Sequence, residues 1–166
     1  MTTLNCAAKL ARRLPLSLVE VPLPSTNALG PWCANTFNIG RFPYLIITNE
    51  KTLLTVLLPF KEIHTIVPRF LQSLKSLLTS LNISSSHIKR EVEQMHDIQF
   101  TQRTNRQTLG SMNDFVHLLK AQLDQGDRQS LDELSVFLSE VPCSPLKMES
   151  PKNAVVRIFS DTDQLC

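Results

Sequence analysis

The stretch 43–59, PYLIITNEKTLLTVLLP, decides the fold, because two apolar runs flank Asn49-Glu50-Lys51. A loop of about three residues between runs rich in β-forming residues predicts a β-hairpin. Pro59 is expected to close the second strand of this hairpin. Both arms are almost wholly apolar, so we expect both faces of the sheet to be covered over part of its length.

Further strands are predicted outward from this hairpin. The segment 32–39, WCANTFNI, alternates loosely between apolar and polar residues, and residues 97–102 alternate at Ile98 and Phe100. Residues 1–5 are expected to form a short first strand. The connection 15–31 holds four prolines and one glycine, so we expect it to be irregular.

Apolar residues at helical spacing predict helices before and after the strands. The predicted helices cover residues 6–14, capped by Asn5 and ended by Pro15, and residues 67–83, 86–95, 106–125, 131–141 and 151–159. Gly126 suits a helix end, and Ser130 with Glu133 forms a capping-box pattern.

These elements predict an α+β fold. We expect a single domain over residues 1–160, in which a mainly antiparallel sheet of four to five strands is packed by five to six helices. Residues 161–166 are expected to form a flexible C-terminal tail.

Composition narrows the class of protein. Hydrophobic residues make up 42% of the 166 residues and charged residues 19%, which excludes a disordered or fibrous chain. The net charge of +2 does not by itself imply a polyanionic partner. The apolar runs are far shorter than the roughly 20 residues of a membrane span, and the N-terminus lacks the layout of a signal peptide. We expect a cytoplasmic protein with no membrane partner.

The cysteines and histidines point to no metal centre. Cys6, Cys33, Cys143 and Cys166 lie far apart in the sequence, which favours reduced thiols in a cytosol. The histidines are scattered and match no compact ligand motif. We therefore expect no metal and no cofactor.

The best functional clue is the stretch 104–115, TNRQTLGSMNDF, within the predicted helix 106–125. A polar stripe beside the core-facing residues of this helix consists of Arg106, Gly110, Asn113 and His117, with Ser111 and Asp114 further round. Glycine inside a helix costs about 1 kcal/mol relative to alanine, and close approach by a backbone or a ligand is the usual gain. An arginine can hold a phosphate or carboxylate through two hydrogen bonds.

Three interpretations of this stripe stay open. It can be a structural network around irregular neighbouring loops, a site for a ligand or nucleic acid, or a catalytic site. For catalysis Arg106 would stabilise negative charge, His117 or Asp114 would move protons, and Asn113 would orient water or substrate. Trp32 and Asn35, in the segment LGPWCAN, could line a pocket, although a core position explains Trp32 as well.

The chain resembles a bacterial domain-of-unknown-function family, family 6933. The resemblance rests on CAAKLARRL, LGPWCAN, NEKTLLTVLLP, TNRQTLGSMNDF and VPCSPL in this order, from about residue 4 to 158. Pro31 and Gln107 depart from the family pattern, where an acidic residue and a serine are common. The resemblance supplies no activity, but it implies that one site contains Trp32, Asn35, Arg106, Gly110, Ser111, Asn113 and Asp114.

Our leading hypothesis is a non-enzymatic binding or regulatory module whose polar pocket accepts an anionic group of a nucleic acid, protein or metabolite. A small hydrolase or nuclease that uses Arg106, Asn113, Asp114 and His117 is the alternative from another class. A structural subunit of a complex is the third. The sequence leaves the oligomeric state open, a homodimer included.

Overall fold

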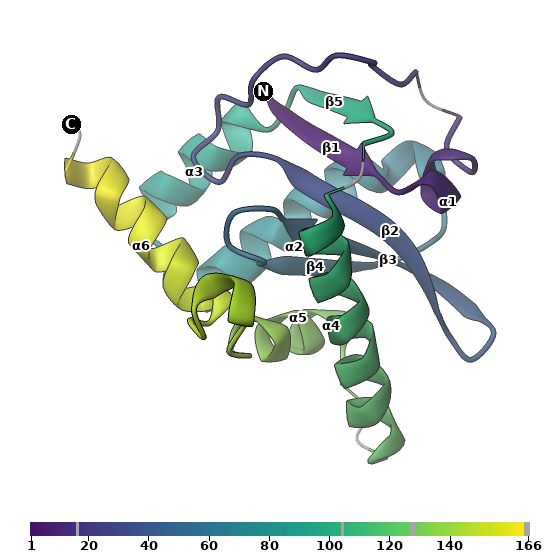
Figure 1. The fold of residues 1–166 in the computed structure, drawn as a ribbon. Coiled ribbons are helices and arrows are strands. Elements are labelled where there is room, and N and C mark those ends of the chain that lie inside the picture. The colour runs from purple at the N-terminus through teal and green to yellow at the C-terminus, as the bar shows by residue number, and fades with distance from the viewer. Residues whose placement is uncertain (16, 104, 127–128, 165–166) are drawn as a thin grey trace.

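The computed structural model describes residues 1–15, 17–103, 105–126 and 129–164. Within these ranges the protein has an α+β fold with a five-stranded sheet and six α-helices (Figure 1). The strands are β1 (Thr2–Cys6), β2 (Trp32–Ile39), β3 (Phe42–Asn49), β4 (Thr55–Pro59) and β5 (Ile98–Thr101). The helices are α1 (Ala8–Ala11), α2 (Ile66–Ser80), α3 (Ser85–Gln94), α4 (Arg106–Asp124), α5 (Leu131–Ser139) and α6 (Pro151–Gln164).

The sheet is mixed, which corrects the expectation of a mainly antiparallel one. Its strand order is β4-β3-β2-β1-β5. The predicted hairpin is present, and β3 pairs in antiparallel fashion with both β2 and β4. However, β1 is parallel to both of its neighbours, β2 and β5. A parallel pair needs a crossover of a dozen or more residues, and the proline-rich connection between α1 and β2 provides one.

Helices cover both faces of the sheet, as the apolar hairpin predicts. The larger core packs α2, α3 and α6 on one face, and its fully buried members include Trp32, Ile47, Phe70, Leu74, Leu78 and Val155. The smaller core packs α4 and α5 on the other face, around Cys33, Ile46, Leu57, Met112, Phe115, Leu119 and Leu138. The smaller core fixes the position of α4, which crosses in front of the sheet in Figure 1.

The loop between β3 and β4 is longer than the three residues expected, since β3 ends at Asn49 and β4 starts at Thr55. The side chain of Asn49 stabilises this loop by hydrogen bonds to its backbone. The Asn49 Oδ1 atom accepts hydrogen bonds from the backbone N–H groups of Lys51 and Thr52, at 3.1 and 2.9 Å. Its Nδ2 atom donates to the Leu29 carbonyl oxygen at 2.8 Å. Leu53 takes a left-handed conformation, with φ 60°. Asn49 therefore joins this loop to the segment that precedes β2.

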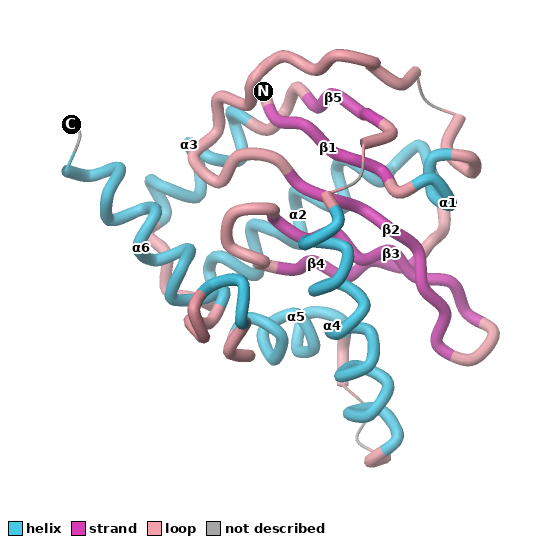
Figure 2. Tube along the Cα trace, viewed as in Figure 1, coloured by secondary structure: helices cyan, strands magenta, loops and turns pink. Residues whose placement is uncertain are grey.

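The exposed edge of β5 is lined by the connection before β2, which Figure 2 shows as a pink loop that passes β5. The Val19 N–H donates to the Phe100 carbonyl oxygen at 2.7 Å. The Gln99 side chain hydrogen-bonds both the N–H and the carbonyl of Leu23, each at 3.0 Å. The connection is thus irregular, as predicted, but it lies along the sheet as an extended strap.

Two predicted helix boundaries are wrong. The first helix is only α1, and Asn5 belongs to β1, where its side chain bonds Glu50 and Thr101 instead of capping a helix. The last helix does not end at Phe159 but continues to Gln164, so residues 161–164 are helical; residues 165–166 lie outside the described part. Phe159 is buried, and this contact holds the longer helix on the larger core.

No helix in the described ranges combines the length and the apolar character that crossing a bilayer requires.

Candidate functional site

The helix α4 begins at Arg106, as predicted, and ends close to its predicted signal, Gly126. The Asn105 side chain caps its N-terminus by accepting a hydrogen bond from the Thr108 N–H at 3.1 Å. Gly126 follows its C-terminus in a left-handed conformation, with φ 86°. Met112, Phe115 and Leu119 are buried against β2 and β3, as the helical spacing predicts.

The polar stripe of α4 faces outward. Arg106, Gly110, Asn113 and His117 are all exposed. A Cβ atom placed on Gly110 would meet no heavy atom within 4 Å, apart from the local backbone of α4. The space over this glycine is therefore not filled by another part of the described chain. The stripe forms an open surface and not a walled pocket, and Arg106 and His117 are separated along the helix axis.

Ser111 and Asp114 lie on a different side of α4, where they line a hollow of about 250 Å³. The hollow lies between α4 and the segment 141–148, and its lining consists of Ser111, Asp114, Phe115, Leu118, Val141, Pro142, Cys143, Ser144, Pro145 and Met148. The structure thus brings together the LGSMND and VPCSPL motifs, which are far apart in the sequence. The lining is mainly apolar, and Asp114 is its one charged residue.

The rim of this hollow has an unusual backbone. Cys143 forms an isolated bridge with Glu149, which closes the segment into a tight loop. Lys147 and Met148, the two residues inside its last turn, both have positive φ, at 54° and 66°. Each non-glycine residue in this region costs about 1–2 kcal/mol. The strained turn holds the Met148 side chain at the edge of the hollow, where it is 64% exposed.

The Cys143 thiol at the floor of the hollow is neutral at ordinary pH. Burial raises the pKa of this thiol, and the nearby Asp114 carboxylate raises it further. The Sγ atom donates a weak hydrogen bond to the Val141 carbonyl oxygen at 3.3 Å. Because the thiolate is the reactive form, the raised pKa disfavours Cys143 as a nucleophile.

Trp32 does not join the α4 residues. It is completely buried on the opposite face of the sheet, where its ring contacts Phe70 edge to face at 5.1 Å. Asn35 is three positions further along β2, so it faces the α4 side, half-buried, and its Oδ1 accepts from the Thr36 N–H at 2.8 Å. Trp32 and Asn35 of the LGPWCAN motif therefore lie on opposite faces of the sheet.

Gly30, in the same motif, has a structural explanation. Its φ of +72° lies in the left-handed region, and the Lys51 side chain passes within 2.8 Å of the position of an added Cβ. The positive φ of Gly30, just before β2, therefore accounts for a glycine at this position.

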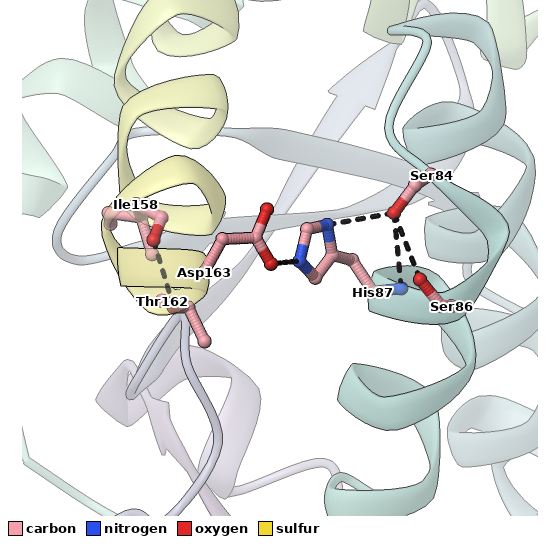
Figure 3. Close-up of polar contacts among 6 residues, drawn as sticks. All are labelled: Ser84, Ser86, His87, Ile158, Thr162 and Asp163. Carbon is pink, nitrogen blue, oxygen red and sulfur yellow. Dashed lines mark hydrogen bonds and ion pairs between the residues drawn. The ribbon is translucent and has the colours of Figure 1, made fainter. Parts of the chain in front are cut away.

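One polar array was missed in the sequence, and Figure 3 shows it between α3 and α6. The Ser84 Oγ lies 2.8 Å from Nδ1 of His87, and the His87 Nε2 lies 2.7 Å from Oδ1 of Asp163. Ser84 caps α3, which its place before a predicted helix could have indicated. Asp163 is 76 residues away from His87 in the sequence, so no local pattern reveals it.

Fold and site define an α+β protein in which a long helix presents a polar stripe beside a small hollow. The chain belongs to the family described as a domain of unknown function, DUF6933, whose model matches residues 3–154. This confirms the family resemblance. No curated protein matches the chain.

Proposed function

We propose that the protein is a binding module that holds an anionic group of a partner on the exposed face of α4. The observation that carries this proposal is the open space over Gly110. Arg106 lies about one turn before Gly110, and Asn113 about one turn after it. Glycine destabilises a helix interior, and nothing in the described chain packs against this one. A visiting group that needs close approach to the helix would offset this cost.

The adjoining hollow favours a protein as the partner. Its apolar lining, with Leu118 and Met148 exposed at 38% and 64%, suits an apolar side chain. Its single charge is the Asp114 carboxylate, which would repel the phosphates of a nucleic acid. A peptide can contact both the polar stripe and the hollow. One of its acidic residues would contact Arg106 or His117, and one of its apolar residues would enter the hollow.

The geometry does not favour a hydrolase or nuclease built on the same residues. Arg106 and His117 are eleven positions apart, which is about 16 Å along the axis of an α-helix. Asp114 lines the hollow, whereas His117 and Arg106 are not among its lining residues. A catalytic group must come within about 3 Å of the reacting atom, and side chains spread over this length of helix do not converge.

The test is a selection of short peptides from a random displayed library, with the purified protein as bait. We expect the enriched peptides to pair an acidic residue with an apolar one a few positions away. Their affinity is expected to fall at least tenfold for Arg106→Ala and for Gly110→Leu, which fills the open space.

Arg12→Ala is the matched control, because Arg12 is an exposed arginine next to α1, whereas the proposed surface is on α4. A labelled single-stranded oligonucleotide of 20 nucleotides is tested in parallel at physiological salt. The proposal is overturned when no peptide is enriched, when the peptides bind Gly110→Leu as well as they bind the unchanged protein, or when the oligonucleotide competes for the same surface.

A further inference from the structure

At the N-terminus of α3, a hydroxyl, an imidazole and a carboxylate lie in a row. This is the order in which a base and an acid activate a serine. The Ser84 hydroxyl is followed by the His87 imidazole and then by the Asp163 carboxylate, at 2.8 and 2.7 Å (Figure 3). An ionised carboxylate only accepts hydrogen bonds, so the proton of a neutral His87 lies on Nε2. Its Nδ1 is then free to take the proton of Ser84. This is the arrangement of nucleophile, base and orienting acid.

The base of this array is held in place, while the nucleophile is accessible. The His87 ring stacks on Phe159 with centroids 5.3 Å apart, and its side chain is 15% exposed. Asp163 comes from the last turn of α6, and it lies on the side of the His87 ring that is opposite to Ser84. Ser84 itself is exposed. A substrate can therefore reach the hydroxyl without displacing the imidazole.

The start of α3 also provides stabilisation for negative charge. The N–H groups in the first turn of a helix have no acceptor within the helix. Within the described residues, the N–H groups of Ser85 and Ser86 donate no hydrogen bond. They follow Ser84 directly, close to the position where the oxygen of a tetrahedral intermediate would develop.

From this juxtaposition we propose that Ser84, His87 and Asp163 form an acyl-transfer site that hydrolyses small activated esters. The Ser84 oxygen bonds to the ester carbonyl carbon, and His87 takes the hydroxyl proton and passes it to the departing alcohol. Water then attacks the acyl-serine, gives its proton to His87, and releases the acid as Ser84 regains a proton. Asp163 keeps the imidazole in the required tautomer. This site is separate from the surface of α4 and does not depend on it.

The experiment uses a fluorophosphonate probe, which phosphonylates activated serines, followed by mass mapping of the labelled peptide. We expect labelling at Ser84 in the full chain. Ser84→Asn keeps a good helix cap and removes the nucleophile, so labelling is expected to vanish although the fold is retained. His87→Gln is expected to lower the labelling rate at least 100-fold, and Asp163→Asn about tenfold.

Ser80→Ala is the control, because Ser80 is an exposed serine at the end of α2, where its Oγ donates to the Ser76 carbonyl oxygen at 3.1 Å and takes no part in the array. Its labelling and its hydrolysis of 4-nitrophenyl acetate are expected to equal those of the unchanged protein. Absence of label at Ser84, or equal labelling of His87→Gln, overturns the proposal and leaves Ser84 as a helix cap.

Discussion

The side-chain amide of Asn27 donates a hydrogen bond of 2.7 Å to the carboxylate of Glu91, and both side chains are almost completely buried. The same carboxylate accepts from the backbone N–H groups of Ala28 and Leu29, at 2.9 and 3.1 Å. Three donors therefore satisfy one buried charge, and α3 is tied to the turn that starts β2.

Glu91→Gln is expected to destabilise the protein by about 2–3 kcal/mol. Both oxygens of Glu91 accept hydrogen bonds, and glutamine replaces one of them with an NH2 group, which cannot accept. One buried N–H donor then loses its acceptor. Urea unfolding followed by circular dichroism measures the change. Glu93→Gln, on the exposed side of the same helix, is the control and should stay within about 0.5 kcal/mol of the unchanged protein. Equal stability of the two variants would contradict the role of Glu91.

Gly110→Ala is expected to stabilise the protein by about 0.5–1 kcal/mol, because an added methyl group meets no atom and alanine is the better helix former. Chemical denaturation gives this value directly. Gly126→Ala should act in the opposite direction, because its φ of +86° is strained for alanine. Loss of stability in Gly110→Ala would mean that the helix face is not open.

Stability is expected to fall as pH rises from about 9 toward 12. Burial, followed by the Glu50 charge, raises the pKa of the Cys33 thiol to about 12, and burial alone does the same for Cys6. In the unfolded chain both thiols ionise near pH 9, so the folded state binds more protons between these values and loses stability with increasing pH. Urea midpoints at pH 7, 9 and 10 measure the slope. The double variant Cys6→Ala and Cys33→Ala should show a smaller slope, and an unchanged slope would assign the effect to other groups.

Phe159→Ala is expected to cost about 3–4 kcal/mol, because the ring is buried in the larger core and stacks on His87. Thermal and urea unfolding measure the loss. Val156→Ala, at an exposed position of the same helix, is the control. A loss below about 1 kcal/mol would show that the second half of α6 contributes little to the core.

Local signals predicted most of the elements. The hairpin arms, α2, α3, α4 and α5 follow from apolar spacing, and Ser130 before α5 and Gly126 after α4 mark helix ends, because these interactions join residues close in sequence. The parallel pairing of β1 with β2 and β5 was not predicted, since it depends on contacts across the proline-rich connection and across most of the chain. Asn5 was assigned as a cap for the same reason, because its partners Glu50 and Thr101 are distant in the sequence.

The candidate site was predictable only in part. Helical geometry placed Arg106, Gly110 and Asn113 on one stripe, because this requires one element alone, but it did not indicate that the stripe is exposed. It did not reveal the hollow at Asp114, whose far wall is the segment around Cys143. The motif that contains Trp32 and Asn35 suggested one site, but alternation along a strand sends neighbouring side chains to opposite faces.

The strap along β5 has a consequence for how this protein can assemble. It holds Pro22 and Pro24, which cannot donate backbone hydrogen bonds. The strap therefore restricts the access of a foreign strand to the β5 edge of the sheet, and stacking of copies through this edge is disfavoured.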